Sequence, residues 1–247
     1  MIFKFKQFSV SQSQSAMKIG TDNVLLGAWV SVDHFPHRIL DIGAGTGVLS
    51  LMLAQRSEAM TIDAVEIDES SFIECTENFE NSPWSDRLFC YFASFQEFAE
   101  EMQEEEPYDL IISNPPFYTE NYKTNSLARN KARFEDSLPF ETLMDGVVQL
   151  LSDEGVFSVI IPFQEEERFI SLAQSKGLFP QKITRVKGNE QSELKRSLIA
   201  FIKNKGEYTS DLLVIEKGRG QYTEAYISLT KDFYLRQYNK KWCLKTL

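Results

Sequence analysis

The stretch Arg38-Ile-Leu-Asp-Ile-Gly-Ala-Gly-Thr-Gly-Val48 carries a short apolar run directly into a glycine-rich loop. Residues 38–42 predict a short buried strand, and residues 48–56, with apolar side chains at helical spacing, predict a helix. Glycines between a strand and a helix allow a tight turn and a close approach of the backbone to a ligand. The stretch therefore predicts a ligand-binding turn, built on Gly43, Gly45 and Gly47.

The spacing of the glycines and one acidic residue narrow the choice of ligand. Val48 stands where the dinucleotide pattern G-x-G-x-x-G has its third glycine, so the loop follows G-x-G-x-G instead. Glu66 lies at the end of the next predicted strand. A carboxylate at that place can accept hydrogen bonds from both hydroxyls of the ribose of an adenosine. The loop and Glu66 together predict a nucleotide-cofactor site.

From residue 38 onward, predicted strands and helices alternate along the chain. Such alternation is typical of βαβ units, and it predicts an α/β fold with a mostly parallel sheet and helices on both faces. Residues 114–138 are polar and loop-like, and the charged residues 187–196 connect two paired strands. The predicted strands are 38–42, 61–67, 88–92, 108–112, 156–161, 182–186 and 197–202, and the predicted helices are 48–56, 69–81, 95–102, 140–151 and 165–176.

No segment of the chain has the composition of a linker, which favours a single domain. We divide it into an N-terminal extension packed on the core (1–37), the core itself (38–205) and a C-terminal appendage (206–247) in which a strand precedes a helix. Serine and glutamine alternate over residues 9–15, and this low-complexity patch predicts a mobile edge.

Composition excludes several classes of protein. Apolar residues make up 43% of the 247 residues, which suits a globular core, and no apolar run of about 18 residues predicts a membrane span. The N-terminus lacks the apolar stretch of a signal peptide, and three scattered cysteines without a C-x-x-C pattern fit the reducing cytoplasm. The two histidines, His34 and His37, have no cysteine cluster beside them, so we expect no metal site.

The charge is unevenly distributed along the chain. The net charge is −10, with 17 acids and 2 bases in residues 41–113, but residues 182–247 carry 7 acids and 14 bases. A basic face can therefore exist on an acidic protein, and it would favour a nucleic-acid partner. Lys195 and Arg196, in the charged connection, are candidates for contacts with RNA phosphates; a solvated surface is the alternative.

The tetrapeptide Asn114-Pro-Pro-Phe117 follows the predicted strand 108–112. In an open α/β sheet, ligands lie beyond the carboxyl ends of the strands, so this motif is expected beside the glycine loop. The side-chain oxygen of Asn114 and the carbonyl oxygen of Pro115 could accept the two hydrogens of an amino group. Phe117 supplies a flat face on which a planar base could stack.

This arrangement indicates chemistry on the exocyclic amine of a base. Such an amine is a weak nucleophile, since its lone pair is delocalised into the ring. Two acceptors on its hydrogens favour a pyramidal nitrogen and direct its lone pair, so that a sulfonium methyl placed in line can be displaced. The base must leave its stack, so a flipped or single-stranded target is expected.

The chain resembles the class I S-adenosylmethionine-dependent amino-methyltransferases, and within them the bacterial valine-tRNA (adenine-N6)-methyltransferase family. The class resemblance is carried by the glycine loop, Glu66 and the Asn-Pro-Pro-Phe motif. The family resemblance covers nearly the whole chain, and its further motifs are Phe5-Lys-Gln-Phe8, Ala16-Met-Lys-Ile-Gly-Thr-Asp22, Leu25-Leu-Gly-Ala-Trp29, Ser82-Pro-Trp84 and Glu224-Ala-Tyr226.

The resemblance implies a Rossmann-like, seven-stranded sheet, S-adenosylmethionine as cofactor, and methylation of the tRNA adenosine just 3′ of the anticodon. It places Lys18, Thr21 and Asp22 near the methionine end of the cofactor or the target. Asp41 and the glycines would hold the methionine part, and Glu66, followed by Ile67, would hold the ribose. Ser94 stands where the family commonly has an aspartate that contacts the adenine amine, which is a departure from the pattern. We expect a monomer.

Four alternatives use related motifs or the same fold. These are guanine-N2 methylation of ribosomal RNA, glutamine methylation of a release factor, DNA adenine methylation, and a non-catalytic protein that binds S-adenosylmethionine and RNA. The release-factor enzymes carry a longer helical N-terminal domain, and the 40 residues before Asp41 favour the tRNA enzymes over them. An intact Asn114-Pro-Pro-Phe117 argues against the non-catalytic protein.

Overall fold

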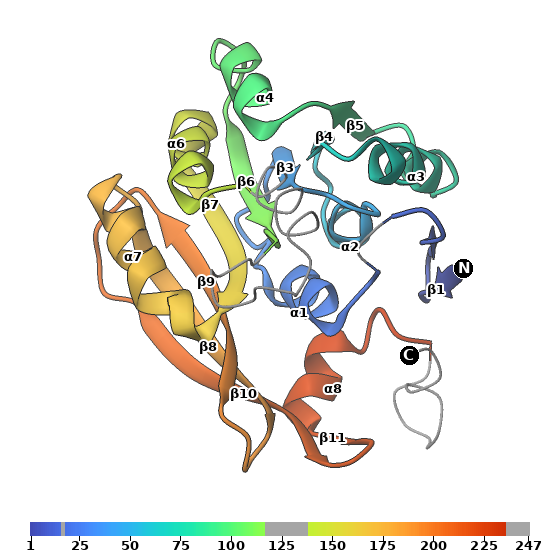
Figure 1. The fold of residues 1–247 in the computed structure, drawn as a ribbon, viewed down its shortest axis with the longest axis vertical. Coiled ribbons are helices and arrows are strands. Elements are labelled where there is room, and N and C mark those ends of the chain that lie inside the picture. The colour runs from blue at the N-terminus through green and yellow to red at the C-terminus, as the bar shows by residue number, and fades with distance from the viewer. Residues whose placement is uncertain (16–17, 117–137, 236–247) are drawn as a thin grey trace, which may run out of the picture.

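The structure is a computed structural model that describes residues 1–15, 18–116 and 138–235. Its centre is a nine-stranded sheet in the order β11-β10-β8-β9-β7-β6-β3-β4-β5 (Figure 1). The sheet strands are β3 (Arg38–Ile42), β4 (Thr61–Glu66), β5 (Leu88–Phe92), β6 (Tyr108–Ser113), β7 (Leu151–Pro162), β8 (Phe179–Asn189), β9 (Leu194–Ile202), β10 (Thr209–Gly218) and β11 (Gln221–Tyr222).

Helices connect most of the strands, and a short hairpin stands apart from the sheet. The hairpin pairs β1 (Ile2–Lys4) with β2 (Ser9–Ser11). The helices are α1 (Thr21–Trp29), α2 (Val48–Arg56), α3 (Glu69–Glu80), α4 (Phe95–Glu101), α6 (Phe140–Leu150), α7 (Glu166–Ser175) and α8 (Glu224–Thr230), with a 3-10 turn at Phe163–Glu165.

Five of the eight strand pairings in the sheet are parallel, which confirms the predicted fold class. The predicted elements 38–42, 48–56 and 88–92 have the observed bounds, and most of the others differ by one or two residues. The strand predicted at 156–161 is longer, because β7 begins at Leu151, directly after α6. Local hydrophobic pattern therefore specified most of this part of the fold.

The core lies in two layers, one on each face of the sheet. On one face pack buried side chains of α1, α2, α3 and α8, and on the other those of α4, α6 and α7. Successive residues of β3 alternate between the layers: Ile39 belongs to the first, and Leu40 to the second. This alternation is why the central strands carry apolar residues on both faces, with buried aspartates such as Asp41 as exceptions.

The expected number of strands is wrong for the described sheet, which has nine strands rather than seven. The seven strands β3 to β9 form the expected unit, and β10 and β11 extend it beyond β8. β10 pairs in parallel with β8 from Thr209 to Glu216, and β11 pairs back on β10. The predicted division into an extension, a core and an appendage of one domain stays a prediction.

The charged connection predicted between the paired strands is largely strand. β8 and β9 are antiparallel, as expected, but they continue to Asn189 and resume at Leu194, so only residues 190–193 join them. Lys195 and Arg196 therefore lie in β9, and Arg196 is opposite Pro162 of β7. A charged strand end has no clear hydrophobic alternation, which is why its sequence suggested a loop.

The serine-glutamine patch at residues 9–15 is not the mobile edge that its composition suggested. Its first three residues form β2, and the side chains of Gln12 and Ser15 are buried. Ser11, Ser13 and Ser15 donate hydrogen bonds to Glu74 of α3. Low complexity was a poor guide because the acceptor that orders these donors lies about 60 residues further along the chain.

Phe201 of β9 tests the layer on the α7 face. Its side chain is fully buried, and its ring lies 6.0 Å from that of Phe157 and 5.9 Å from that of Phe169. We expect Phe201→Ala to lower the free energy of unfolding by about 3–5 kcal/mol, measured by denaturant titration, because it removes a large buried ring. Phe89→Ala, at a half-exposed ring, is the control; equal losses for both variants would contradict this packing.

Candidate active site

The candidate site is at the carboxyl edge of the parallel strands. Each of β3, β4, β5 and β6 is followed there by one predicted site segment. In the sheet register Ile42 pairs with both Val65 and Ser113, and Glu66 pairs with Phe92. The glycine loop, Glu66, Ser94 and Asn114 therefore follow adjacent strands at one edge, although up to 71 residues separate Gly43 from Asn114 in sequence.

The glycine loop is shaped by backbone angles and by contacts from α3. Gly43, Gly45 and Gly47 all have positive φ, at 71°, 56° and 75°. A methyl group on Gly47 would come within 2.7 Å of the Cys75 sulfur. Gly43 and Gly45 face open space instead, since no described heavy atom lies within 4 Å of a Cβ placed there. Two glycines thus expose the backbone to a ligand, and the third lets α3 pack beneath the loop.

Asp41 is held by the first turn of α2. Its Oδ2 atom accepts hydrogen bonds from the backbone N–H and the hydroxyl of Ser50, at 3.1 and 2.7 Å. The other oxygen, Oδ1, is buried and has no partner among the described residues. Burial raises the pKa of Asp41 to about 7, against the lowering effect of the Ser50 hydrogen bonds. A buried carboxylate with an unused oxygen suits a cationic ligand group such as an ammonium.

Glu66 connects the end of β4 to the glycine loop. Its two oxygens accept hydrogen bonds from the backbone N–H groups of Gly45 and Asp68, at 2.7 and 2.8 Å. Burial raises the pKa of Glu66, and these hydrogen bonds oppose the shift. Each oxygen has a second lone pair, so the carboxylate can still accept two ribose hydroxyls. Ile67, the next residue, exposes about half of its side chain at the same edge.

Ser94 forms the N-terminal cap of α4. Its hydroxyl accepts from the Glu97 backbone N–H and donates to the Glu97 carboxylate, at 3.2 and 2.7 Å. The Glu97 carboxylate in turn accepts from the Ser94 backbone N–H. This capping box uses the only hydroxyl hydrogen of Ser94, so one lone pair remains for a ligand amine.

Asn114 and Pro115 follow directly from the end of β6. Asn114 is half-buried and Pro115 is buried. The hydroxyl of Ser113 donates to the carbonyl oxygen of Ile42 at 2.9 Å, which fixes this strand end against the start of the glycine loop. Phe117, the predicted stacking residue, lies outside the described residues, as does most of the loop predicted at 114–138.

The residues expected from the N-terminal segment reach the same edge from α1. Thr21 opens α1, and Asp22 beside it forms an ion pair with Arg196 at 2.7 Å. Arg196 is the third residue of β9. Because β9 runs antiparallel to β7, it begins at the carboxyl edge of the parallel strands. The Lys18 ammonium donates to the carbonyl oxygens of Gln12 and Ser15, at 2.6 and 2.9 Å, so it also organises its own segment.

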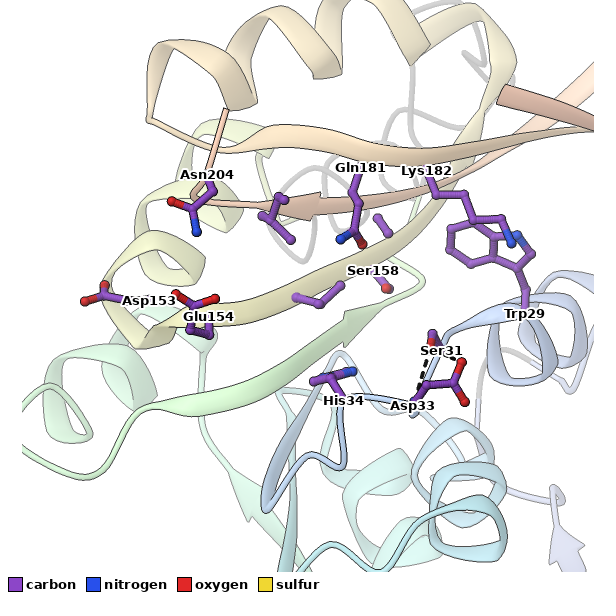
Figure 2. Close-up of a pocket in the computed structure, with 13 residues that line it drawn as sticks. Trp29, Ser31, Asp33, His34, Asp153, Glu154, Ser158, Gln181, Lys182 and Asn204 are labelled. Atoms are coloured by element: carbon purple, nitrogen blue, oxygen red, sulfur yellow. Dashed lines mark hydrogen bonds between the residues drawn. The ribbon is translucent and has the colours of Figure 1, made fainter. Parts of the chain in front are cut away.

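A cavity of about 390 Å³ lies at the opposite edge and contains none of the predicted site residues (Figure 2). Its walls come from the α1–β3 connection and from the amino ends of β7 and β8, represented by His34, Asp153 and Lys182. Because ligands of open α/β sheets bind beyond the carboxyl ends of the strands, this cavity is not the cofactor site. Within the described residues no three His, Cys, Asp or Glu side chains gather as metal ligands.

The open space at Gly43 and Gly45, the unpartnered Oδ1 of Asp41 and the free lone pairs of Glu66 fit S-adenosylmethionine, whose ammonium and ribose need these groups. This fold and this site are those of a class I, S-adenosylmethionine-dependent methyltransferase. In agreement with that class, residues 12–133 match the family model of the methyltransferase small domain.

Sequence similarity to known proteins identifies the family to which the chain belongs. The chain is 60% identical over 95% of its length to the tRNA1(Val) (adenine(37)-N6)-methyltransferase of Flavobacterium psychrophilum, covering 100% of that protein. It is 42% identical to the enzyme of the same name from Bacteroides fragilis, over 95% of this chain and 98% of that one. The chain belongs to the tRNA1(Val) (adenine(37)-N6)-methyltransferase family, which confirms the resemblance seen in the sequence.

A solved structure agrees at the level of the fold. A predicted O-methyltransferase from Agrobacterium tumefaciens superimposes with a TM-score of 0.68, covering 86% of this chain and 96% of that one, at 21% identity. Identity this low supports the shared architecture only.

The raised pKa of Asp41 makes a testable contribution to stability. An aspartate with a pKa near 3.8 when unfolded and about 7 when folded binds its proton more tightly in the folded state. It therefore contributes stability at low pH that is lost as the pH rises from about 4 to 7. We expect Asp41→Asn to gain stability relative to the native chain across this interval and to show no further relative change above it.

The measurement is the free energy of unfolding from denaturant titrations at several pH values. Asp109→Asn is the control, because it makes the same change at a carboxylate near the amino edge of the sheet, where Asp109 accepts from the His37 N–H. If the free energies of unfolding of the native chain and Asp41→Asn differ by a constant amount from pH 4 to 7, the raised pKa of Asp41 is contradicted.

Proposed function

We propose that this chain transfers the methyl group of S-adenosylmethionine to the N6 amine of adenosine 37 in a valine tRNA, as the names of its relatives state for them. The observation that carries the proposal is the pairing of β3 with β6, which ends with Asn114 beside the glycine loop. Cofactor and target amine can then meet at one point of the sheet edge.

The residues of this chain hold the two reactants in line. Asp41 and the loop glycines bind the methionine part of the cofactor, and Glu66 with Ile67 binds its ribose. The Asn114 side-chain oxygen and the Pro115 carbonyl oxygen accept the two N6 hydrogens and direct the nitrogen lone pair. Phe117 stacks on the adenine. When bound, the cofactor supplies an electrophilic methyl group on its sulfonium.

The reaction needs little acid–base catalysis by the protein. The N6 nitrogen forms a bond to the methyl carbon while the bond from that carbon to sulfur breaks. The methylated amine then loses a proton to water, so no histidine is required. Rate comes from positioning and from the oriented acceptors, which interact most strongly as positive charge develops on the nitrogen.

The tRNA is proposed to lie over the carboxyl end of the β8–β9–β10 part of the sheet. Because β8 and β10 are parallel to β7, their ends carry Lys187, Lys217 and Arg219 to the same edge as Asn114. Lys195 is exposed there on β9. Glu190 and Glu193 lie in the turn beside it, so the face is mixed and not uniformly basic. Arg196 is engaged with Asp22, and we assign phosphate contact chiefly to Lys195.

We also propose a monomeric, metal-independent enzyme that works in the cytoplasm, where unmodified tRNA is available. In the part of the chain that the structure describes, no helix is long and apolar enough to cross a membrane.

The proposal is tested by methyl transfer from labelled S-adenosylmethionine into unmodified valine tRNA, with the product nucleoside identified by mass spectrometry. We expect N6-methyladenosine. If the product is N2-methylguanosine, the mechanism stands but the adenosine target is wrong. If the RNA carries no label although the cofactor binds tightly, a non-catalytic role is favoured.

Asn114→Ala tests the amine contact. We expect turnover to fall about 10²–10³-fold, as when one oriented hydrogen-bonding group is removed from a reaction centre, with cofactor affinity nearly unchanged. Single-turnover methylation and calorimetric cofactor binding give the two numbers. Asn204→Ala, an exposed residue at the opposite edge, is the control; native turnover in Asn114→Ala would remove Asn114 from the mechanism.

Lys195→Ala tests the RNA face. We expect weaker tRNA binding and a plot of log K against log salt that is shallower by about one unit, because one phosphate contact is lost. Lys205→Ala removes the same charge beyond the far end of β9 and should leave the slope unchanged. An unchanged slope in Lys195→Ala would mean that Lys195 contacts no phosphate and is only part of the solvated surface.

A further inference from the structure

Glu74 of α3 is a carboxylate enclosed by the N-terminal segment. Its side chain is fully buried, and no lysine or arginine in the described residues forms an ion pair with it. A buried charge without a counterion is costly unless hydrogen bonds replace the lost water. The catalytic scheme above makes no use of Glu74.

Residues 11–15, which we name the serine segment, supply those hydrogen bonds. The Ser11, Ser13 and Ser15 hydroxyls donate to the carboxylate at 3.0, 3.0 and 2.6 Å. The backbone N–H groups of Ser13, Gln14 and Ser15 donate as well, at 2.5 to 3.2 Å. Loss of water alone would raise the pKa of Glu74, but these bonds outweigh it and lower the pKa to about 2.

Asn78, one turn further along α3, ties the serine segment to the glycine loop. Its side-chain oxygen accepts from the Ser11 N–H at 2.7 Å, and its amide group donates to the Ser11 and Thr46 carbonyl oxygens at 3.0 and 2.9 Å. Asn78 is buried, so these hydrogen bonds are shielded from water. One face of α3 therefore contacts both the serine segment and the loop proposed to hold the cofactor.

The serine segment also determines where Lys18 lies. The Lys18 ammonium donates to the carbonyl oxygens of Gln12 and Ser15, two residues of that segment. The side-chain oxygen of Gln12 accepts from the Ile19 N–H at 2.9 Å. Lys18, which the family resemblance places near the methionine end of the cofactor or the target, is thus positioned by a segment that is itself bound to Glu74.

We propose that Glu74 is a positioning residue whose carboxylate holds the serine segment against α3 and so couples the order of that segment to cofactor binding at the glycine loop. This inference rests on the proposed function. Coupling of this kind is reciprocal: if the held segment favours the cofactor, the cofactor must favour the held segment by the same free energy.

The first test compares Glu74→Gln with Glu77→Gln, which removes an exposed carboxylate on the same helix. The glutamine keeps the shape but replaces one acceptor oxygen with an N–H₂ group that faces donors. We expect hydrogen exchange of residues 9–15 to rise at least about tenfold in Glu74→Gln, with exchange of β3 and β6 unchanged. Glu77→Gln should match the native chain.

The second readout is the dissociation constant of S-adenosylmethionine, measured by calorimetry without RNA. We expect it to rise about tenfold in Glu74→Gln, and saturating cofactor to restore part of the protection at residues 9–15. In the methylation assay KM for the cofactor should rise more than kcat falls. A residue that only stabilises the fold would lower the melting temperature without this split.

Two results overturn the proposal. Unchanged exchange at residues 9–15 means that Glu74 does not hold the segment. Faster exchange with native cofactor affinity means that the segment is not coupled to the site. If the native chain methylates no tRNA, the proposed function is refuted. The role of Glu74 can still be tested in that case, because hydrogen exchange and cofactor binding are measured without RNA.

Ser15→Ala keeps the inference testable where Glu74→Gln does not fold. It removes the 2.6 Å hydroxyl bond and leaves the carboxylate and the backbone donors in place. We expect smaller changes of the same sign in exchange and in cofactor affinity. Ser9→Ala, at an exposed serine of β2, is the control; equal behaviour of the two serine variants also overturns the proposal.

Discussion

The parallel pairing of β3 with β6 is the constraint on which the site depends. Ile42 opposite Ser113 brings two loops together that have no local relation in sequence, one made of glycines and one of asparagine and proline. The Ser113 hydroxyl bond to the Ile42 carbonyl secures the strand ends at the point where the loops begin. A slip of one residue would turn every side chain of β6 to the other face, and Asn114 with them.

Charge at this edge is balanced by hydrogen bonds more than by ion pairs. Glu66 and Glu74 are buried carboxylates whose partners are N–H and O–H groups. Among the described residues, the side chain of Asp41 is hydrogen-bonded to Ser50 alone. Glu66 and Asp41 keep unused acceptor capacity, which we propose serves the cofactor, whereas Glu74 is saturated. The acidity of residues 41–113 thus reflects, in part, groups with distinct structural roles and not only a solvated surface.

The sequence predicted the parts of the fold that obey a local pattern. The apolar run 38–42, the glycines after it and the asparagine-proline motif after residues 108–112 were enough to predict a parallel sheet and the residues at its edge. A strand was expected within residues 206–247, but its addition to the sheet beside β8 was not, since a local pattern does not show which strands pair. Lys195 and Arg196 were assigned to a connection because the charged first residues of β9 show no clear hydrophobic alternation.

The contact between the serine segment and Glu74 was not predicted, because the two lie about 60 residues apart in the chain. A spacing of Ser-x-Ser-x-Ser places three hydroxyls on one side of an extended backbone, and Glu74 with Asn78 is an i, i+4 polar pair on the buried side of a helix. Each feature is ordinary alone, and only their meeting gives them a role. The Ser94 departure has a local explanation instead, since its hydroxyl forms a capping box with Glu97, three residues further along the chain.

The central claim is that this sheet edge presents one target amine to the cofactor. The most direct measurement is the rate of methyl transfer into valine tRNA and into the same tRNA carrying guanosine in place of adenosine 37, with both tRNAs shown to bind equally. We expect stoichiometric methylation of the first tRNA and none of the second. Equal methylation of the two tRNAs would contradict it.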